Sequence, residues 1–161
     1  MIDALSDRRR NQFGEEWVFV DWGILVSARL GSSVNFEATL TLLGDEELEF
    51  ITTPHEVERF LAALTSLDHI SGEEALRELE LLLRYIRVFE IPRGYSKEIL
   101  RLQQLLDPRG KPAMELSTVA TLTLSGIKRL FTYRPHLYPE NCDKAGVQIL
   151  VPPGGTIITP S

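Results

Sequence analysis

Three acidic residues stand beside apolar segments of the chain, where they could contribute to one site. Asp21 directly follows an apolar run that begins at Trp17. Glu58 lies shortly after a Thr-Pro pair, and Glu115 begins another apolar stretch. Carboxylate oxygens are the ligands that Mg²⁺ and Mn²⁺ prefer in proteins. If folding brings the three acids together, they form an oxygen-rich pocket suited to one of these ions.

Alternating strands and helices are predicted to position these acids. Short β-branched and aromatic segments predict strands over 17–21, 49–52, 87–91, 129–132 and 147–151. Apolar residues at spacings of three and four, together with capping signals, predict helices over 23–30, 36–43, 54–64, 71–85, 95–106 and 115–124. This alternation predicts an α/β fold with a mainly parallel sheet.

In such a sheet, ligands bind beyond the carboxyl ends of the strands. Asp21 and Thr132 are both at predicted strand ends, and Glu58 lies one turn into the helix that follows a strand. The predicted topology therefore allows these side chains to converge at one edge of the sheet.

Composition indicates a single globular domain. The chain has 161 residues, of which 43% are hydrophobic and 25% charged, values that are typical of a globular protein. Residues 1–16 are polar and basic and are predicted to be a lead-in, within which Arg8-Arg9-Arg10 is either a solvated run or an RNA contact. Residues 153–161, rich in Pro and Gly, are predicted to form an extended tail.

Charge and cysteine content bear on partners and compartment. The net charge of −6 argues against a protein that coats nucleic acid through bulk positive charge, but it leaves room for a local basic patch. No apolar run approaches the length of a membrane span, and no apolar stretch of a secretory signal follows the N-terminal basic cluster. Cys142 is the only cysteine, so no internal disulfide forms and a cytoplasmic location is predicted.

Three segments in order resemble the motifs of the PIN-domain family, which includes the ribonuclease toxins of toxin–antitoxin pairs. Residues 18–28 resemble its opening strand, acid and helix. Residues 50–61 resemble its second motif, a strand, a Ser/Thr-Pro turn and a helix-borne glutamate. Residues 115–132 resemble its third motif, in which an acid begins a helix that leads to a strand ending in Thr. The resemblance covers roughly residues 17–152.

The resemblance implies a three-layer α/β/α fold with about five strands and a metal-dependent ribonuclease activity. Asp21, Glu58 and Glu115 would be both metal ligands and catalytic residues for Mg²⁺ or Mn²⁺. The metal would lower the pKa of a bound water and neutralise charge on the scissile phosphate. Thr132 and Arg134 would contact the RNA substrate. A small antitoxin and a homodimer would be the expected partners, with no membrane association.

Three positions depart from the family pattern. Glu115 replaces the usual aspartate, and Trp22-Gly23 replaces a polar pair that helps to order the metal site. Arg134 stands where the family often has a fourth aspartate. Its guanidinium either clamps phosphate or pairs with Glu115 and leaves the pocket neutral. Glu140 and Asp143 are alternative positions for the missing acid.

These departures favour an alternative, an inactive PIN-like domain that binds RNA or protein. A third hypothesis is a flavodoxin-like α/β domain with unrelated acids. In that case Asp21 acts alone. Each acid also has a structural interpretation, in which Asp21 caps a helix, Glu58 (or the neighbouring Glu56) lies on a solvated face, and Glu115 favours the dipole of its helix. Metal binding separates the first two hypotheses. The third requires that the acids lie more than roughly 8 Å apart, beyond the span of a shared metal site.

Overall fold

A central sheet of five parallel strands organises the fold. The computed structural model describes residues 14–107 and 113–160, so the Arg8-Arg9-Arg10 run and most of the predicted lead-in lie outside the described residues. The strands are β1 (Trp17–Val20), β2 (Glu49–Thr52), β3 (Ile86–Val88), β4 (Arg129–Phe131) and β5 (Gln148–Leu150). Their order is β3-β2-β1-β4-β5, and every neighbouring pair is parallel. The predicted parallel α/β fold is confirmed.

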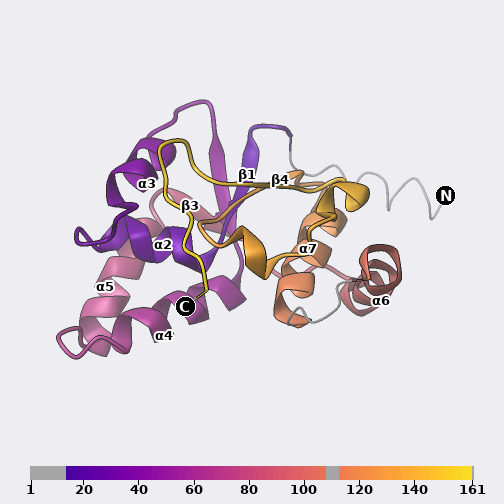
Figure 1. Ribbon diagram of the computed structural model, residues 1–161. Helices are drawn as coiled ribbons and strands as arrows, with labels where there is room; N and C mark the ends of the chain where they lie inside the picture. The colour runs from indigo at the N-terminus through magenta and orange to yellow at the C-terminus, as the bar shows by residue number, and fades with distance from the viewer. Residues whose placement is uncertain (1–13, 108–112, 161) are drawn as a thin grey trace.

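Helices cover both faces of this sheet, which makes three layers (Figure 1). The helices are α2 (Trp22–Arg29), α3 (Phe36–Leu43), α4 (Pro54–Thr65), α5 (Gly72–Leu82), α6 (Tyr95–Leu106) and α7 (Ala113–Ser125), with 3₁₀ turns η1 (Pro135–Leu137) and η2 (Cys142–Ala145). Helices α2 to α5 pack in one apolar core, and α6 and α7 pack in the other.

Alternation along the strands explains the two cores. Val18 and Val20 of β1 belong to the core with α2 to α5, and Phe19 between them belongs to the core with α6 and α7. Phe50 and Ile51 of β2 divide in the same way. Successive side chains of a strand point to opposite faces of the sheet, so a strand buried on both sides has few polar residues along its length.

Local capping signals set several helix starts. Ser71 and Glu74 form the predicted capping box at the start of α5, with reciprocal distances of 3.1 Å and 2.7 Å. Pro54 occupies the first turn of α4, where its missing N–H costs nothing. The α4 start places the next residues of that helix beyond the carboxyl end of β2.

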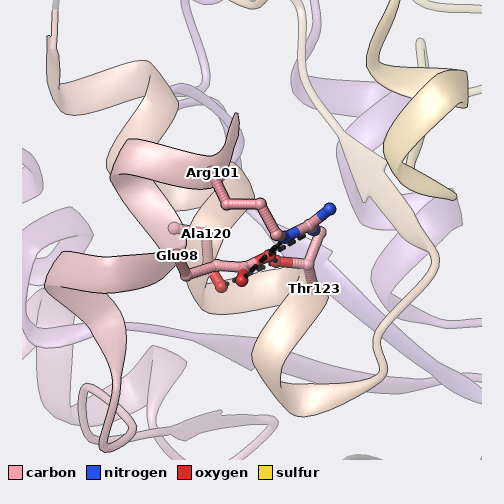
Figure 2. A network of polar contacts seen from close by, with 4 residues as sticks. All are labelled: Glu98, Arg101, Ala120 and Thr123. Carbon is pink, nitrogen blue, oxygen red and sulfur yellow. Dashed lines mark hydrogen bonds and ion pairs between the residues drawn. The ribbon is translucent and has the colours of Figure 1, made fainter. Parts of the chain in front are cut away.

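A polar network on α6 and α7 holds these two helices together (Figure 2). Glu98 of α6 accepts hydrogen bonds from Nε of Arg101 at 3.0 Å and 3.1 Å. The hydroxyl of Thr123 on α7 lies 2.8 Å from the Glu98 carboxylate and 3.0 Å from the carbonyl oxygen of Ala120. The network fixes α7, on which Glu115 is carried, relative to α6.

The C-terminal segment is fastened beside the end of β4. The Asn35 amide pairs with both backbone groups of Thr156, at 2.9 Å and 2.6 Å. The N–H of Ile158 donates to the carbonyl oxygen of Tyr133 at 2.7 Å. A Cβ on Gly155 would lie 2.5 Å from the Tyr133 ring, so glycine permits this close approach. Within the described residues, no helix has the length and apolarity of a membrane span.

Candidate functional site

Asp21 lies where β1 ends and α2 begins. Its Oδ1 accepts a hydrogen bond from the N–H of Ile24 at 3.2 Å, so it caps α2. Its Oδ2 accepts a hydrogen bond from the hydroxyl of Tyr138 at 3.0 Å, and Thr132 provides a further side-chain bond. The carboxylate is almost completely buried, with 2% of the residue exposed. Asp21 therefore caps a helix and also lies at the centre of a buried polar site.

The second acid of the site is Glu56, not the predicted Glu58. Only 1% of Glu56 is exposed. Its Oε2 accepts a hydrogen bond from the N–H of Trp22 at 2.8 Å, and its Oε1 accepts one from the Thr118 hydroxyl at 3.2 Å. Glu58 is exposed to solvent. Two residues correspond to roughly 200° around a helix, so these neighbours face opposite ways. The structure therefore places Glu58 on the solvent face of α4 and Glu56 against the start of α2.

Glu115, the third acid, is buried in the first turn of α7, with 3% of its side chain exposed. The Nη1 atom of Arg59 lies 3.8 Å from its Oε1. A pairing of Arg134 with Glu115 was one expectation from the sequence, and the cation that the structure places next to Glu115 is Arg59. We refer to Asp21, Glu56 and Glu115 as the acid cluster.

Two arginines contact the ring of Trp22. The Arg59 guanidinium lies 5.1 Å from the ring centroid and that of Arg134 lies 4.7 Å from it, both within cation–π range. A Cβ on Gly23 would be 2.8 Å from Nη1 of Arg134. The Trp22-Gly23 pair therefore supplies an aromatic ring and an open space for Arg134. We refer to Arg59, Trp22 and Arg134 as the arginine–tryptophan cluster.

Tyr138 and Thr132 connect the acids to the arginines. Burial raises the pKa of Tyr138 well above its ordinary value, and the charges of the nearby acids, Asp21, Glu56 and Glu115, raise it further. The Thr132 hydroxyl oxygen accepts a hydrogen bond from the Arg134 N–H at 2.9 Å. All three acids thus act on one buried hydroxyl, and Thr132 lies between Asp21 and the backbone of Arg134.

Burial controls the protonation of the acid cluster. It raises the pKa of Asp21, against the lowering effect of hydrogen bonds from Thr132, Ile24 and Tyr138 and of the charge of Arg134. Burial and the charge of Asp21 raise the pKa of Glu56 to about 7, although the Trp22 N–H, Arg59 and Thr118 oppose this shift. Glu56 is therefore partly protonated near neutral pH.

The donor set of the acid cluster does not fit a divalent cation. Both oxygens of Asp21 and both of Glu56 accept hydrogen bonds from protein groups, and the Arg59 guanidinium lies beside Glu115. Among residues 14–107 and 113–160, no group of three or more His, Cys, Asp or Glu side chains is arranged to hold a metal ion. A hard cation binds ionised carboxylates with oxygens directed at it, whereas the oxygens of Asp21 and Glu56 are directed at protein donors and Oε1 of Glu115 lies beside Arg59.

Neither alternative fourth acid reaches this site. Glu140 and Asp143 are both exposed. Asp143 instead lines an open pocket of about 810 Å³ with Trp17, Arg129 and Gln148, which begin β1, β4 and β5. This pocket is at the amino ends of the strands, while the acid cluster follows their carboxyl ends.

Four residues of the site were not predicted from the sequence as site residues, namely Glu56, Arg59, Thr118 and Tyr138. The burial of Glu56 could have been predicted from the sequence. Glu56, Phe60 and Leu64 are spaced four residues apart, so they lie on the same buried face of α4. Arg59 follows Glu58 but points toward Trp22. Tyr138 follows a 3₁₀ turn, and no periodic pattern marks it.

The fold resembles the folds of several solved structures. No family model and no curated protein matches the sequence. The structure of VapC20 from Mycobacterium tuberculosis, a sarcin–ricin loop cleaving toxin, matches with a TM-score of 0.60 at 14% identity, covering 81% of this chain and 96% of that one. VapBC2 from Rickettsia felis, bound to a promoter DNA fragment, matches with a TM-score of 0.64 at 11% identity over 84% and 98% of the two chains. FitAcB from Neisseria gonorrhoeae matches with a TM-score of 0.61 at 14% identity, over 84% and 97%. The fold is PIN-like, as the sequence resemblance predicted.

Proposed function

We propose that this chain is a PIN-like domain that binds RNA through Arg59, Trp22 and Arg134, without a divalent cation in the acid cluster. The observation that supports this most directly is the pair of guanidinium groups over the ring of Trp22, at 5.1 Å and 4.7 Å. Guanidinium groups match phosphate oxygens in a bidentate way. RNA-binding surfaces combine such cations with aromatic side chains.

The acid cluster has a supporting role in this proposal. Arg59 lies beside Glu115, and the charge of Arg134 acts on Asp21, so buried carboxylates orient both cations. Glu56 is partly protonated near neutral pH because its pKa is about 7. Protonation reduces the negative charge beneath the two guanidiniums, which favours an incoming phosphate. RNA binding should therefore be tighter at pH 6 than at pH 8.

The test is a fluorescence anisotropy titration of labelled single-stranded RNA in EDTA and in Mn²⁺. We expect binding in both buffers and at least tenfold weaker binding by Arg134→Gln, since a lost charged hydrogen bond costs about 1.5–3 kcal/mol. Arg84→Gln is the matched control, because Arg84 is an exposed arginine in the turn between α5 and β3. We expect it to change the affinity less than twofold. Failure of the wild type to bind RNA in either buffer would contradict the proposal and direct attention to protein partners.

Gly23→Ala tests the same surface without removing a charge. The new Cβ would meet only the mobile end of Arg134 and the carboxylate of Asp21, so the guanidinium must move. Alanine is a better helix former than glycine by about 1 kcal/mol, and we expect stability to be kept while RNA affinity falls. Gly72→Ala, at the start of α5 with nothing near its Cβ position, is the control. Unchanged RNA affinity in Gly23→Ala would show that the position of Arg134 is not important.

The second candidate is the metal-dependent ribonuclease, with Asp21, Glu56 and Glu115 as its acids. The observation that favours it is that all three acids lie near the Tyr138 hydroxyl, in a fold like that of VapC20, described as a sarcin–ricin loop cleaving toxin. The Mg²⁺ or Mn²⁺ cofactor, an antitoxin partner and a homodimer would accompany this function. The cytoplasmic location stays a prediction for both candidates.

Calorimetry separates the two candidates. Mn²⁺ is titrated into the wild type and into Asp21→Asn, and each protein is then incubated with RNA. We expect no specific heat of binding in either protein. Binding that Asp21→Asn abolishes, together with RNA cleavage by the wild type, would favour the ribonuclease instead.

A further inference from the structure

A small pocket lies next to the acid cluster, between α4, α7 and the segment that leads into α6. It encloses about 240 Å³. Four of its lining residues carry an aliphatic hydroxyl, two are aromatic and one is aliphatic: Thr53, Ser117, Thr118, Thr121, His55, Tyr95 and Ile91. Thr53, Thr118 and Thr121 are buried. We infer that this hydroxyl pocket takes one unstacked nucleobase of the bound RNA, an inference that rests on the proposed RNA binding.

The chemistry of the lining favours a neutral, flat, polar group. Among the residues that the structure describes, no Asp, Glu, Lys or Arg lines the pocket, so a neutral group fits this lining better than a phosphate or a basic group. Thr118 donates its hydroxyl proton to Oε1 of Glu56 at 3.2 Å, and Thr121 donates its own to the carbonyl oxygen of Ser117 at 3.1 Å. Toward a ligand these two hydroxyls therefore act as acceptors, which suits the N–H groups on the edge of a base. The Tyr95 ring adds an aromatic surface of the kind on which splayed-out bases stack.

The size of the pocket limits the ligand to about one ring system. Pockets for drug-sized ligands span roughly 300–1,000 Å³, and this one is smaller. A sugar-phosphate chain would therefore remain outside while a single base enters. This arrangement fits RNA recognition, in which unstacked bases are read individually.

The hydroxyl pocket and the arginine–tryptophan cluster share a helix, because α4 carries both His55 and Arg59. His55 and Arg59 are four residues apart on α4, so their side chains are neighbours on one helix face. The Thr118 hydroxyl, in the pocket wall, lies 3.2 Å from Oε1 of Glu56. On α7, Thr118 follows Glu115 by three residues, and Glu115 lies beside Arg59. A backbone phosphate at Arg59 would thus leave an adjacent base within reach of the pocket.

The experiment compares an eight-nucleotide RNA of mixed sequence with a ribose-phosphate chain of the same length that has no bases. Anisotropy titrations use the full chain and two variants. Ser117→Phe fills the pocket from α7, and Ser66→Phe adds the same ring on the exposed end of α4 as a control. We expect the wild type and Ser66→Phe to bind the RNA roughly tenfold more tightly than the abasic chain, the effect of one stacked base. We expect Ser117→Phe to bind both chains with the affinity of the abasic one.

The outcomes separate this inference from the proposed function. If the wild type binds RNA and the abasic chain equally, while Arg134→Gln weakens both, the base pocket is refuted and the phosphate contact stands. If the wild type discriminates and Ser117→Phe discriminates equally, the base is read elsewhere and the inference is also refuted. If neither chain binds the wild type, the proposed function fails and the inference fails with it. Circular dichroism of Ser117→Phe establishes that the variant is folded.

Discussion

Two glutamates of this molecule, Glu98 and Glu56, each accept a hydrogen bond from a threonine of α7, but their charges are compensated differently. In the α6–α7 network, Glu98 accepts hydrogen bonds from Arg101 and from the hydroxyl of Thr123 (Figure 2). In the acid cluster, Glu56 accepts hydrogen bonds from the Trp22 N–H and from the hydroxyl of Thr118. Both carboxylates connect neighbouring helices, and both contact a threonine of α7.

The difference lies in how each charge is compensated. Glu98 has a guanidinium in direct contact, and their hydrogen bond raises the pKa of Arg101. Arg101 is half exposed, which keeps water close to that pair. Asp21 and Glu56 are buried, and their direct partners are backbone N–H groups and hydroxyls. These neutral donors offset only part of the desolvation, so both pKa values are raised.

This comparison supports the proposed role of the acid cluster. A fully compensated ion pair at the surface serves to hold helices together and stabilises only weakly. A group of buried acids with raised pKa values is costly to maintain, and such groups concentrate at functional sites. The stability of the acid cluster should therefore depend strongly on pH and on its neutral donors, whereas the α6–α7 network should depend weakly on its ion pair.

The largest expected effect is that of Glu56→Gln on the pH dependence of stability. In the folded protein the pKa of Glu56 is about 7, against an ordinary value of 4.5. The folded state thus binds this proton more tightly than the unfolded state does. The contribution of Glu56 to the free energy of unfolding is therefore complete below pH 4.5 and is lost as the pH rises through 7. Gln imitates the protonated acid. We expect Glu56→Gln to be about 1–3 kcal/mol more stable than the wild type at pH 8 and nearly equal to it at pH 4.5, by urea unfolding.

Glu58→Gln is the control for this measurement. It makes the same chemical change two residues away, on a side chain that is exposed to solvent. Its unfolding free energy should follow that of the wild type at each pH. Equal behaviour of the two variants would contradict the distinction between the buried and the exposed glutamate of α4.

The next effect in size concerns the tyrosine hydroxyl that binds Asp21. Tyr138→Phe removes the donor to Oδ2 of a buried carboxylate, and we expect a loss of about 1.5–3 kcal/mol at pH 8. Tyr133→Phe is the matched control, because Tyr133 is equally buried but its hydroxyl lies 2.7 Å from that of Thr39, a neutral partner. We expect a loss of about 1 kcal/mol there, with a weaker dependence on the protonation of Asp21, whose charge acts on Tyr133 without a direct hydrogen bond. Two equal losses at pH 8 would mean that the charge of Asp21 is not important to this bond.

The fold was predictable from the sequence because its signals are local. The parallel strands follow from short apolar runs, and the capping box of Ser71 and Glu74 follows from residue types at fixed spacing. The presence of Asp21 and Glu115 in a buried polar site was also accessible, because both border apolar segments. The choice of Glu56 over Glu58 needed the register of α4, which its apolar residues specify.

Other features of the site depend on contacts between distant segments. Tyr138 reaches Asp21 from more than a hundred residues away, and no spacing rule relates the two positions. The attachment of Arg134 to Trp22, and the need for Gly23 beside it, arise only when the start of α2 meets the end of β4. The sequence marked Trp22-Gly23 and Arg134 as departures from the family pattern, but it did not show that they contact one another.

The smallest expected effect comes from the ion pair of the α6–α7 network. Arg101→Gln removes a cation whose side chain is 53% exposed, while Glu98 keeps its contact with Thr123. We expect a loss below about 1 kcal/mol that shrinks further in high salt. Arg59→Gln removes a cation next to Glu115, which is only 3% exposed, and should cost more and depend less on salt, because solvent ions screen buried charges poorly. Urea unfolding of both variants at low and high salt makes the comparison. If the two losses are equal in size and in salt dependence, the acid cluster is compensated in the same way as the surface network, and its buried acids no longer indicate a functional site.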